Sequence, residues 1–149
     1  MFDMDRGVAD PQNSKLLWTA ISLLCAAFGL AIFTAWVPTF EHLGDPLWTQ
    51  HQKLHVFREI FLVTVFSGIG IALCFGPLRN GQARSPEAVG LVGFGVVAGF
   101  WVGVPVTGVG KNEIAPFLNH GLQAVCLIVG YVLAHYALSG SDKEASESV

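Results

Sequence analysis

Three side chains that can bind a metal ion or move a proton recur at one helical spacing, at the start of an apolar segment. His51, His55 and Glu59 stand at positions i, i+4 and i+8. On a helix that begins near Trp48 they share one face, an arc of roughly 80 degrees. Arg58 falls within the same arc. One helical face therefore carries three potential ligands and one cation.

This spacing suits two kinds of site. A His-x-x-x-His pair on a helix can converge on one metal ion, so His51 and His55 are the predicted metal ligands, and Glu59 would orient His55 or ligate directly. A histidine here could equally be the axial ligand of a haem held between helices. The alternative is that these are polar residues at headgroup level, with Trp48 as the matching aromatic anchor. An ionisable residue in a membrane segment favours function, so we interpret His55 as ligand or general base. The sequence leaves the cofactor unknown, with a metal ion or a haem as the candidates.

A second polar cluster opens the last apolar segment. Asn119, His120 and Gln123 would be one to two turns inside a membrane span, where unpaired polar groups are costly, so they must face the other helices. They would either hydrogen-bond between helices or complete a pocket in which amides hold a substrate oxygen and a histidine moves a proton. The predicted catalytic residues are His55, Glu59, Asn119 and His120, and the predicted substrate-binding residues are Trp48, Arg58, Trp101 and Gln123. By contrast, His135 is expected to be an interfacial or packing residue.

Four apolar runs must carry these side chains. They cover residues 16–37, 56–76, 88–109 and 114–138, and about 20 apolar residues suffice for a helix to cross a membrane. Gly76-Pro77 should end the second run, Pro105 should kink or end the third, and Asn112 is placed to cap the fourth. Residues 1–15 form a polar N-terminal segment, and residues 139–149 are expected to be a disordered tail. The predicted fold class is all-α, an integral membrane four-helix bundle.

Composition agrees with a membrane protein. Of the 149 residues, 52% are hydrophobic and 13% are charged, and the mean hydropathy is +0.55, which indicates one membrane domain. The net charge is −3 and the eight Lys and Arg residues are scattered, so binding to nucleic acid is excluded. The three cysteines stand far apart in apolar runs and are interpreted as buried small hydrophobic residues. Membrane lipids and a small lipophilic molecule are the expected partners.

The distribution of Lys and Arg predicts the orientation. With four spans both termini lie on one side of the membrane. That side would hold Arg6, Lys15, Arg79, Arg84 and Lys143, and the other side Lys53, Arg58 and Lys111. Five cations against three favour cytoplasmic termini.

Small residues repeat at helical spacing in three of the runs. Gly95, Gly99 and Gly103 stand at i, i+4 and i+8, which predicts that the third helix is the most tightly packed. Similar stripes are Gly68, Ala72 and Gly76 in the second run and Ala27, Ala31 and Ala35 in the first. The stripes would serve either packing within the bundle or a homo-oligomer interface.

A wider pattern resembles a family of small, uncharacterised four-span membrane proteins of bacteria and fungi. It consists of Glu41-His42, Asp45-Pro46-Leu47-Trp48, His51, Lys53, His55, Gly99-Phe100-Trp101, Pro105 and Gly108-Val109-Gly110. This resemblance covers nearly the whole chain and implies a fold without an activity.

Two enzyme families share shorter features with the chain. Trp48 followed by His51 or His55 is similar to the styrene oxide isomerase type of membrane enzyme, which implies haem ligation and Lewis-acid opening of an epoxide. The offset between tryptophan and histidine differs from that family's, and Arg58 stands where its polar residue is expected. The His55 and Glu59 pair is similar to the emopamil-binding type of sterol isomerase.

The function predicted from these residues is an isomerase or a cyclase that acts on a small lipophilic molecule by acid/base or metal- or haem-assisted chemistry. A redox enzyme fits less well, because the sequence contains no nucleotide-binding loop and no soluble domain to supply hydride. The alternative is a metal-, haem- or lipid-binding membrane protein, or an accessory subunit, without catalysis.

Overall fold

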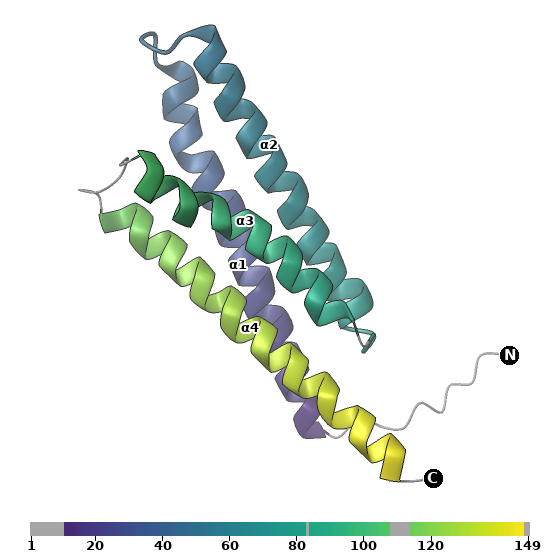
Figure 1. The fold of residues 1–149 in the computed structure, drawn as a ribbon. Coiled ribbons are helices and arrows are strands. Elements are labelled where there is room, and N and C mark those ends of the chain that lie inside the picture. The colour runs from purple at the N-terminus through teal and green to yellow at the C-terminus, as the bar shows by residue number, and fades with distance from the viewer. Residues whose placement is uncertain (1–10, 83, 108–113, 148–149) are drawn as a thin grey trace, which may run out of the picture.

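The computed structural model describes residues 11–82, 84–107 and 114–147, and this part of the chain is helical apart from short connections (Figure 1). The helices are α1 (Pro11–Gly44), α2 (Gln50–Leu73), α3 (Ser85–Thr107) and α4 (Ile114–Glu147), and a π-helical turn, η1 (Cys74–Leu78), continues α2. The predicted all-α four-helix fold is confirmed.

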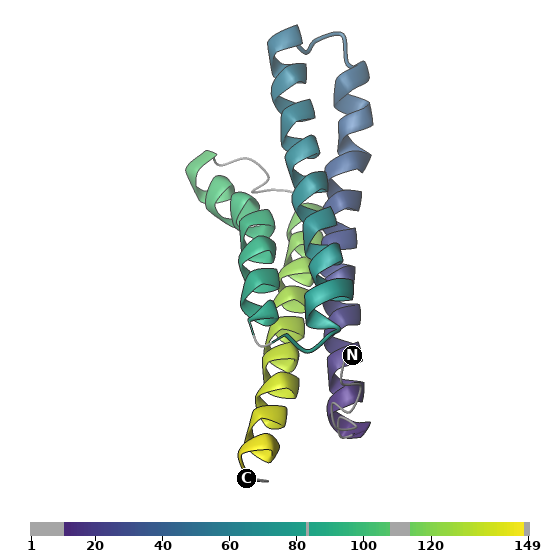
Figure 2. The ribbon, with the colours of Figure 1, turned by 90° about the vertical axis from the view of Figure 1, so that its right-hand side faces the viewer.

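Each helix contains a segment that is long and apolar enough to cross a membrane. The four spans are Gln12–Val37, Gln50–Leu78, Ser85–Gly103 and Phe117–Ser139, and they correspond to the four apolar runs of the sequence. The start of α1 and the end of α4 lie at the same end of the bundle (Figures 1 and 2). The chain is therefore a multi-pass integral membrane protein. Which side of the membrane holds that end stays a prediction of the charge distribution.

The start of α2 is fixed by a capping box. The backbone N–H of Gln52 donates to Thr49 Oγ1 at 3.2 Å, and the Thr49 N–H donates to Gln52 Oε1 at 2.8 Å. Two backbone donors at the helix start are satisfied in this way. The helix thus begins at Gln50, six residues before the apolar run, and includes both His51 and His55.

The end of the second span follows from Pro77. Proline has no N–H, so the carbonyl of Leu73 loses its usual partner four residues on, and the helix widens into η1. There the Arg79 N–H donates to the Cys74 carbonyl and the Gln82 N–H to the Pro77 carbonyl, each at 3.1 Å and five residues apart. The span ends at Leu78, next to the predicted stop at Gly76-Pro77.

The C-terminal tail differs from the prediction. Disorder was expected over residues 139–149, whereas α4 continues to Glu147. Once a helix exists, each further residue adds one backbone hydrogen bond, and Lys143, Glu144 and Ala145 are good helix formers. The predicted polar segment 1–15 also overlaps α1, which begins at Pro11 with proline in the first turn. Residues 1–10 and the predicted cap Asn112 lie outside the described residues.

One half of the bundle is a packed core, and we call it the packed half. It contains the end of α2 with η1, the first part of α3 and the facing parts of α1 and α4, and α1 packs most extensively, against α4 and α2. Its buried apolar residues come from α1, η1, α3 and α4: Ala20, Ile21, Leu24, Ala27, Phe28, Cys74, Leu78, Val89, Val97, Leu127 and Ala134. Cys74 of η1 is part of this core, and Cys25 of α1 packs against it. The other half, toward the α1–α2 loop, is the open half, and there this loop projects beyond the neighbouring ends of α3 and α4 (Figure 2).

The prediction that the third helix is the most tightly packed is wrong. A Cβ atom built on Gly95, Gly99 or Gly103 would meet no atom within 4 Å. The glycines at close approaches are Gly70, Gly90, Gly93 and Gly130, all in the packed half. Gly93 is only two residues from Gly95, but two residues turn a helix by about 200 degrees, so they face opposite ways. The i, i+4, i+8 spacing correctly places the three glycines on one face of α3. It does not predict what lies opposite that face.

Candidate functional site

A cavity of about 620 Å³ lies in the open half, and all four helices contribute to its wall. Its polar wall residues are Thr34 of α1, His55, Arg58 and Glu59 of α2, and His120 and Gln123 of α4. Its apolar wall residues are Ala31, Ala35, Val56, Ile60, Leu62, Val63, Phe66, Gly95, Val96, Gly99 and Phe100. Five of the residues predicted for the site therefore lie around one space. The volume is in the range of ligand pockets in proteins.

His55 is connected to His51 one helical turn away. Their Nε2 atoms are 3.0 Å apart, and their rings meet edge to face with centroids 4.5 Å apart. Because a proton must lie between two nitrogens at this distance, one Nε2 donates and the other accepts. His51 is not part of the cavity wall. Within residues 11–82, 84–107 and 114–147, no group of three His, Cys, Asp or Glu side chains could hold a metal ion, so the predicted metal site has two ligands here and stays a prediction.

His120 is held from two sides. Its Nδ1 lies 3.1 Å from Oε1 of Gln123, and Gln123 is only 2% exposed. An amide oxygen can only accept, so the proton of a neutral His120 resides on Nδ1 and the lone pair on Nε2. On the ring face, Phe100 of α3 stacks with centroids 3.7 Å apart and planes 20° apart. These contacts fix both the ring orientation and the nitrogen that can act as a base.

Besides His51, three predicted residues do not reach the cavity wall. Asn119 is exposed on α4, because it precedes His120 by one residue and so points about 100 degrees away from it. Trp101 is 42% exposed and packs edge to face against Phe100 and Phe117. Trp48 lies in the connection before α2, where its backbone N–H donates to the backbone carbonyl of Asp45. For these three residues the structure gives no role in the cavity.

Phe100 and Thr34 line the cavity but were not among the site residues predicted from the sequence. Phe100 stood in the Gly99-Phe100-Trp101 motif, but only its tryptophan was selected as a binding residue. Thr34 lies within the first apolar run, and its hydroxyl donates back to the Leu30 carbonyl at 2.8 Å. No periodicity distinguishes a threonine that faces a cavity from one that faces lipid, since both satisfy their hydroxyl within the helix.

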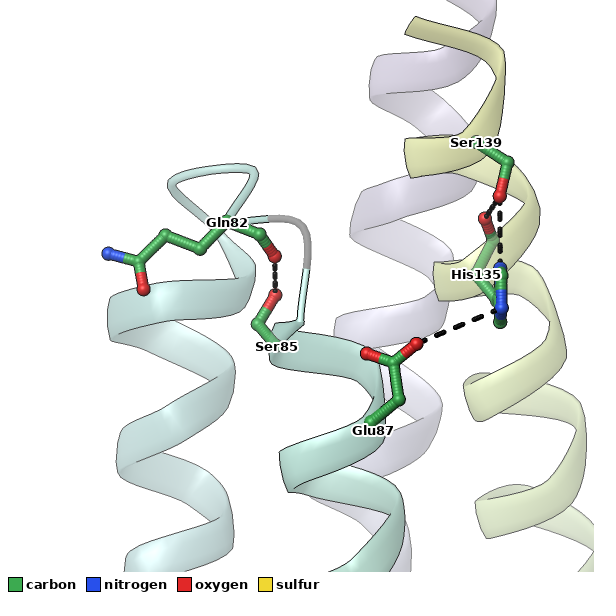
Figure 3. Close-up of polar contacts among 5 residues, drawn as sticks. All are labelled: Gln82, Ser85, Glu87, His135 and Ser139. Carbon is green, nitrogen blue, oxygen red and sulfur yellow. Dashed lines mark hydrogen bonds and ion pairs between the residues drawn. The ribbon is translucent and has the colours of Figure 1, made fainter. Parts of the chain in front are cut away.

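A second polar cluster lies at the opposite end of the bundle, where α3 begins (Figure 3). His135 Nε2 is 3.9 Å from Oε1 of Glu87, and both side chains are 53% exposed. His135 Nδ1 lies 3.0 Å from Oγ of Ser139, whose hydroxyl donates to the His135 carbonyl at 2.8 Å. Because the Ser139 hydroxyl donates to the backbone, its oxygen is free to accept from His135 Nδ1. This cluster is a surface contact between α3 and α4, as expected for an interfacial His135.

Comparison of the chain with family models, curated proteins and solved structures finds no match. The function must therefore be inferred from the cavity.

Proposed function

We propose that this membrane protein binds a small lipophilic molecule in the cavity and acts on its polar end by acid/base chemistry, as an isomerase-type enzyme. The observation that carries the proposal is that His55, Arg58, Glu59, His120 and Gln123, from two helices distant in sequence, line one cavity. Ionisable residues around a space within a membrane bundle are costly to keep unless they serve a function. With cytoplasmic termini, as the charges predict, the polar end of the cavity faces the non-cytoplasmic side.

His120 is the best candidate for the base. Its Nδ1 donates to Gln123, so its Nε2 carries the lone pair that could take a proton from the carbon between a carbonyl group and a carbon–carbon double bond of the ligand. Arg58 and His55, on the same wall, would stabilise negative charge that develops on the carbonyl oxygen. The protonated His120 would then return the proton to a different carbon. The double bond shifts, the proton count is unchanged and no co-reactant is consumed, which fits an isomerisation.

A protein that binds the lipophile without converting it would use the same wall. The two functions differ in product formation, so both can be tested on one preparation. The purified protein in nanodiscs is incubated with a lipid extract of the host membrane, and the extract is separated by chromatography with mass detection. An isomerase consumes one compound and forms another of equal mass.

The matched variants are His120→Asn in the cavity and His135→Asn in the surface cluster at the other end. Conversion by the wild type and by His135→Asn, but not by His120→Asn, supports the enzyme. A compound that copurifies with the wild type and not with His120→Asn, without any conversion, supports binding alone. If neither conversion nor a copurifying compound distinguishes His120→Asn from the wild type, the cavity is not the functional site.

A further inference from the structure

The two ends of the cavity differ in polarity. Its polar residues gather at one end, around His55 and His120, and its other end is apolar, reaching Phe66 of α2 and Gly95 of α3. From His55 to Phe66 the helix rises about 16 Å. A ligand that fills this space is therefore elongated, with its polar group at one end.

The charges at the polar end indicate what that group is. Arg58 contributes one cation and Glu59 one anion, so the wall has no net charge when the histidines are neutral. An anionic head group would meet Glu59 and a cationic one would meet Arg58, and each like-charge approach is unfavourable in a membrane. An uncharged oxygen function can accept from Arg58 and donate to Glu59 or to His120 Nε2 without such a penalty.

The apolar end opens to the outside of the bundle. Leu62 and Phe66 line the cavity and are also 46% and 48% exposed, and Gly95 and Gly99 across from them on α3 are exposed as well. We call the opening between these four residues the slot. A Cβ on either glycine would meet no atom within 4 Å. Phe66 and Gly95 stand near the middle of the spans Gln50–Leu78 and Ser85–Gly103, so the slot faces the hydrocarbon interior of the membrane and not water.

From these features we infer that the ligand is an elongated, uncharged lipophile with an oxygen-bearing end, and that it enters sideways from the bilayer through the slot between α2 and α3. The inference rests on the proposed function, because it requires the cavity to be a binding site. A path from the aqueous side would instead be tail first and would carry the apolar part of the ligand past Arg58 and Glu59. Entry through the slot lets that part remain in lipid until the polar end meets its partners.

The test uses a long-chain primary alcohol with a photoreactive diazirine at mid-chain, added to the full-length protein in phosphatidylcholine vesicles. Irradiation labels neighbouring residues, which mass spectrometry identifies. Excess 1-hexadecanol competes for a true site but leaves general labelling of the lipid-exposed surface. We expect competable labelling of cavity residues such as Val63 and Val96 in the wild type.

Two substitutions change the slot in opposite directions. Gly95→Phe puts a ring into the opening and should abolish the competable label, whereas Phe66→Ala widens it and should increase the rate of labelling. The matched control is Gly68→Phe on α2, where a Cβ also meets no atom within 4 Å but the residue is not part of the cavity wall. This control should label like the wild type.

The outcomes separate the two proposals. Competable labelling that persists in Gly95→Phe and is unchanged in Phe66→Ala overturns entry through the slot and leaves the binding function standing. If the wild type shows no competable label in the cavity, the proposed binding of such a lipophile fails. If Gly95→Phe does not fold, the rate measured with Phe66→Ala decides by itself, since a slot that limits entry must respond to widening.

Discussion

The two halves of this bundle use the same residue type for opposite purposes. In the packed half, Gly93 and Gly130 let a neighbouring helix approach so closely that a Cβ would collide with it. In the open half, Gly95 and Gly99 border a cavity, and the space above them is empty of protein. The comparison teaches that the same small residue can lie on a face that a neighbouring helix occupies or on a face that borders a cavity. Small residues at helical spacing do not tell whether a helix or a ligand occupies their face.

The largest effect is expected from the centre of the packed half. Phe28 is 1% exposed and its ring lies against Gly70. Phe28→Ala should lower the free energy of unfolding by about 3 to 5 kcal/mol, the usual result of emptying a core site of an aromatic ring. Thermal unfolding in detergent measures it. Phe33→Ala is the control, because Phe33 is 60% exposed on the same helix and should change stability little.

The glycines give the direct test of the comparison. Gly130→Leu would drive a side chain into Leu24 and the backbone oxygen of Ala20, and overpacking of this kind costs about 1 to 3 kcal/mol. Gly99→Leu has open space and should leave the melting temperature unchanged or raise it slightly, because leucine is the better helix former. If the third helix were the most tightly packed, as its glycine spacing predicts, Gly99→Leu would instead unfold the bundle. Equal destabilisation by the two variants would mean that the halves do not differ.

A smaller effect is expected where α1 and α2 meet in the open half. Trp36 Nε1 donates to Thr64 Oγ1 at 3.0 Å, and a hydrogen bond between membrane helices typically contributes about 0.6 kcal/mol. A double-mutant cycle with Trp36→Phe and Thr64→Val should give a coupling energy of this size. A coupling near zero would show that the bond does not hold the helices together.

The smallest effect is expected at the surface cluster of Glu87 and His135. Exposed ion pairs contribute at most about 1 kcal/mol and are screened by salt. At a pH at which His135 is charged, Glu87→Gln should therefore lower stability by about 0.5 kcal/mol or less at low ionic strength, and the difference from the wild type should vanish in high salt. A salt-independent loss would instead indicate that Glu87 packs against α4 through its methylene groups.

The fold could be read from the sequence because the membrane allows few alternatives. Four apolar runs of sufficient length must become four helices, since backbone groups in lipid have to be satisfied within each segment. The face shared by His55 and Glu59 was also predictable once α2 starts before His51, and the Thr49-x-x-Gln52 pattern provides that start.

The remainder of the site depends on how the helices rotate and tilt against one another. Asn119 and His120 are adjacent in sequence, yet only His120 lines the cavity. Cys25 and Cys74 belong to one core although 49 positions separate them, and no local sequence pattern predicts that they share it. Trp101 was predicted to bind the substrate because it is a tryptophan, whereas its neighbour Phe100 is the residue that stacks on His120. Contacts between residues of different helices cannot be predicted from the periodicity within one segment.

The unequal lengths of the spans have a mechanical consequence. The span in α3 has 19 residues and the span of α2 with η1 has 29, which correspond to about 28 Å and about 43 Å of helix, against a hydrocarbon core of about 30 Å. The span in α3 matches that thickness without tilting, whereas the span of α2 with η1 must tilt or extend beyond it. When the bilayer thickness changes, the two spans adjust their tilt by different amounts, so the angle between the two elements that border the slot depends on the acyl chains of the host lipid. Reconstitution in lipids of increasing chain length should therefore change the rate of ligand uptake. The melting temperature of the protein should not change in parallel.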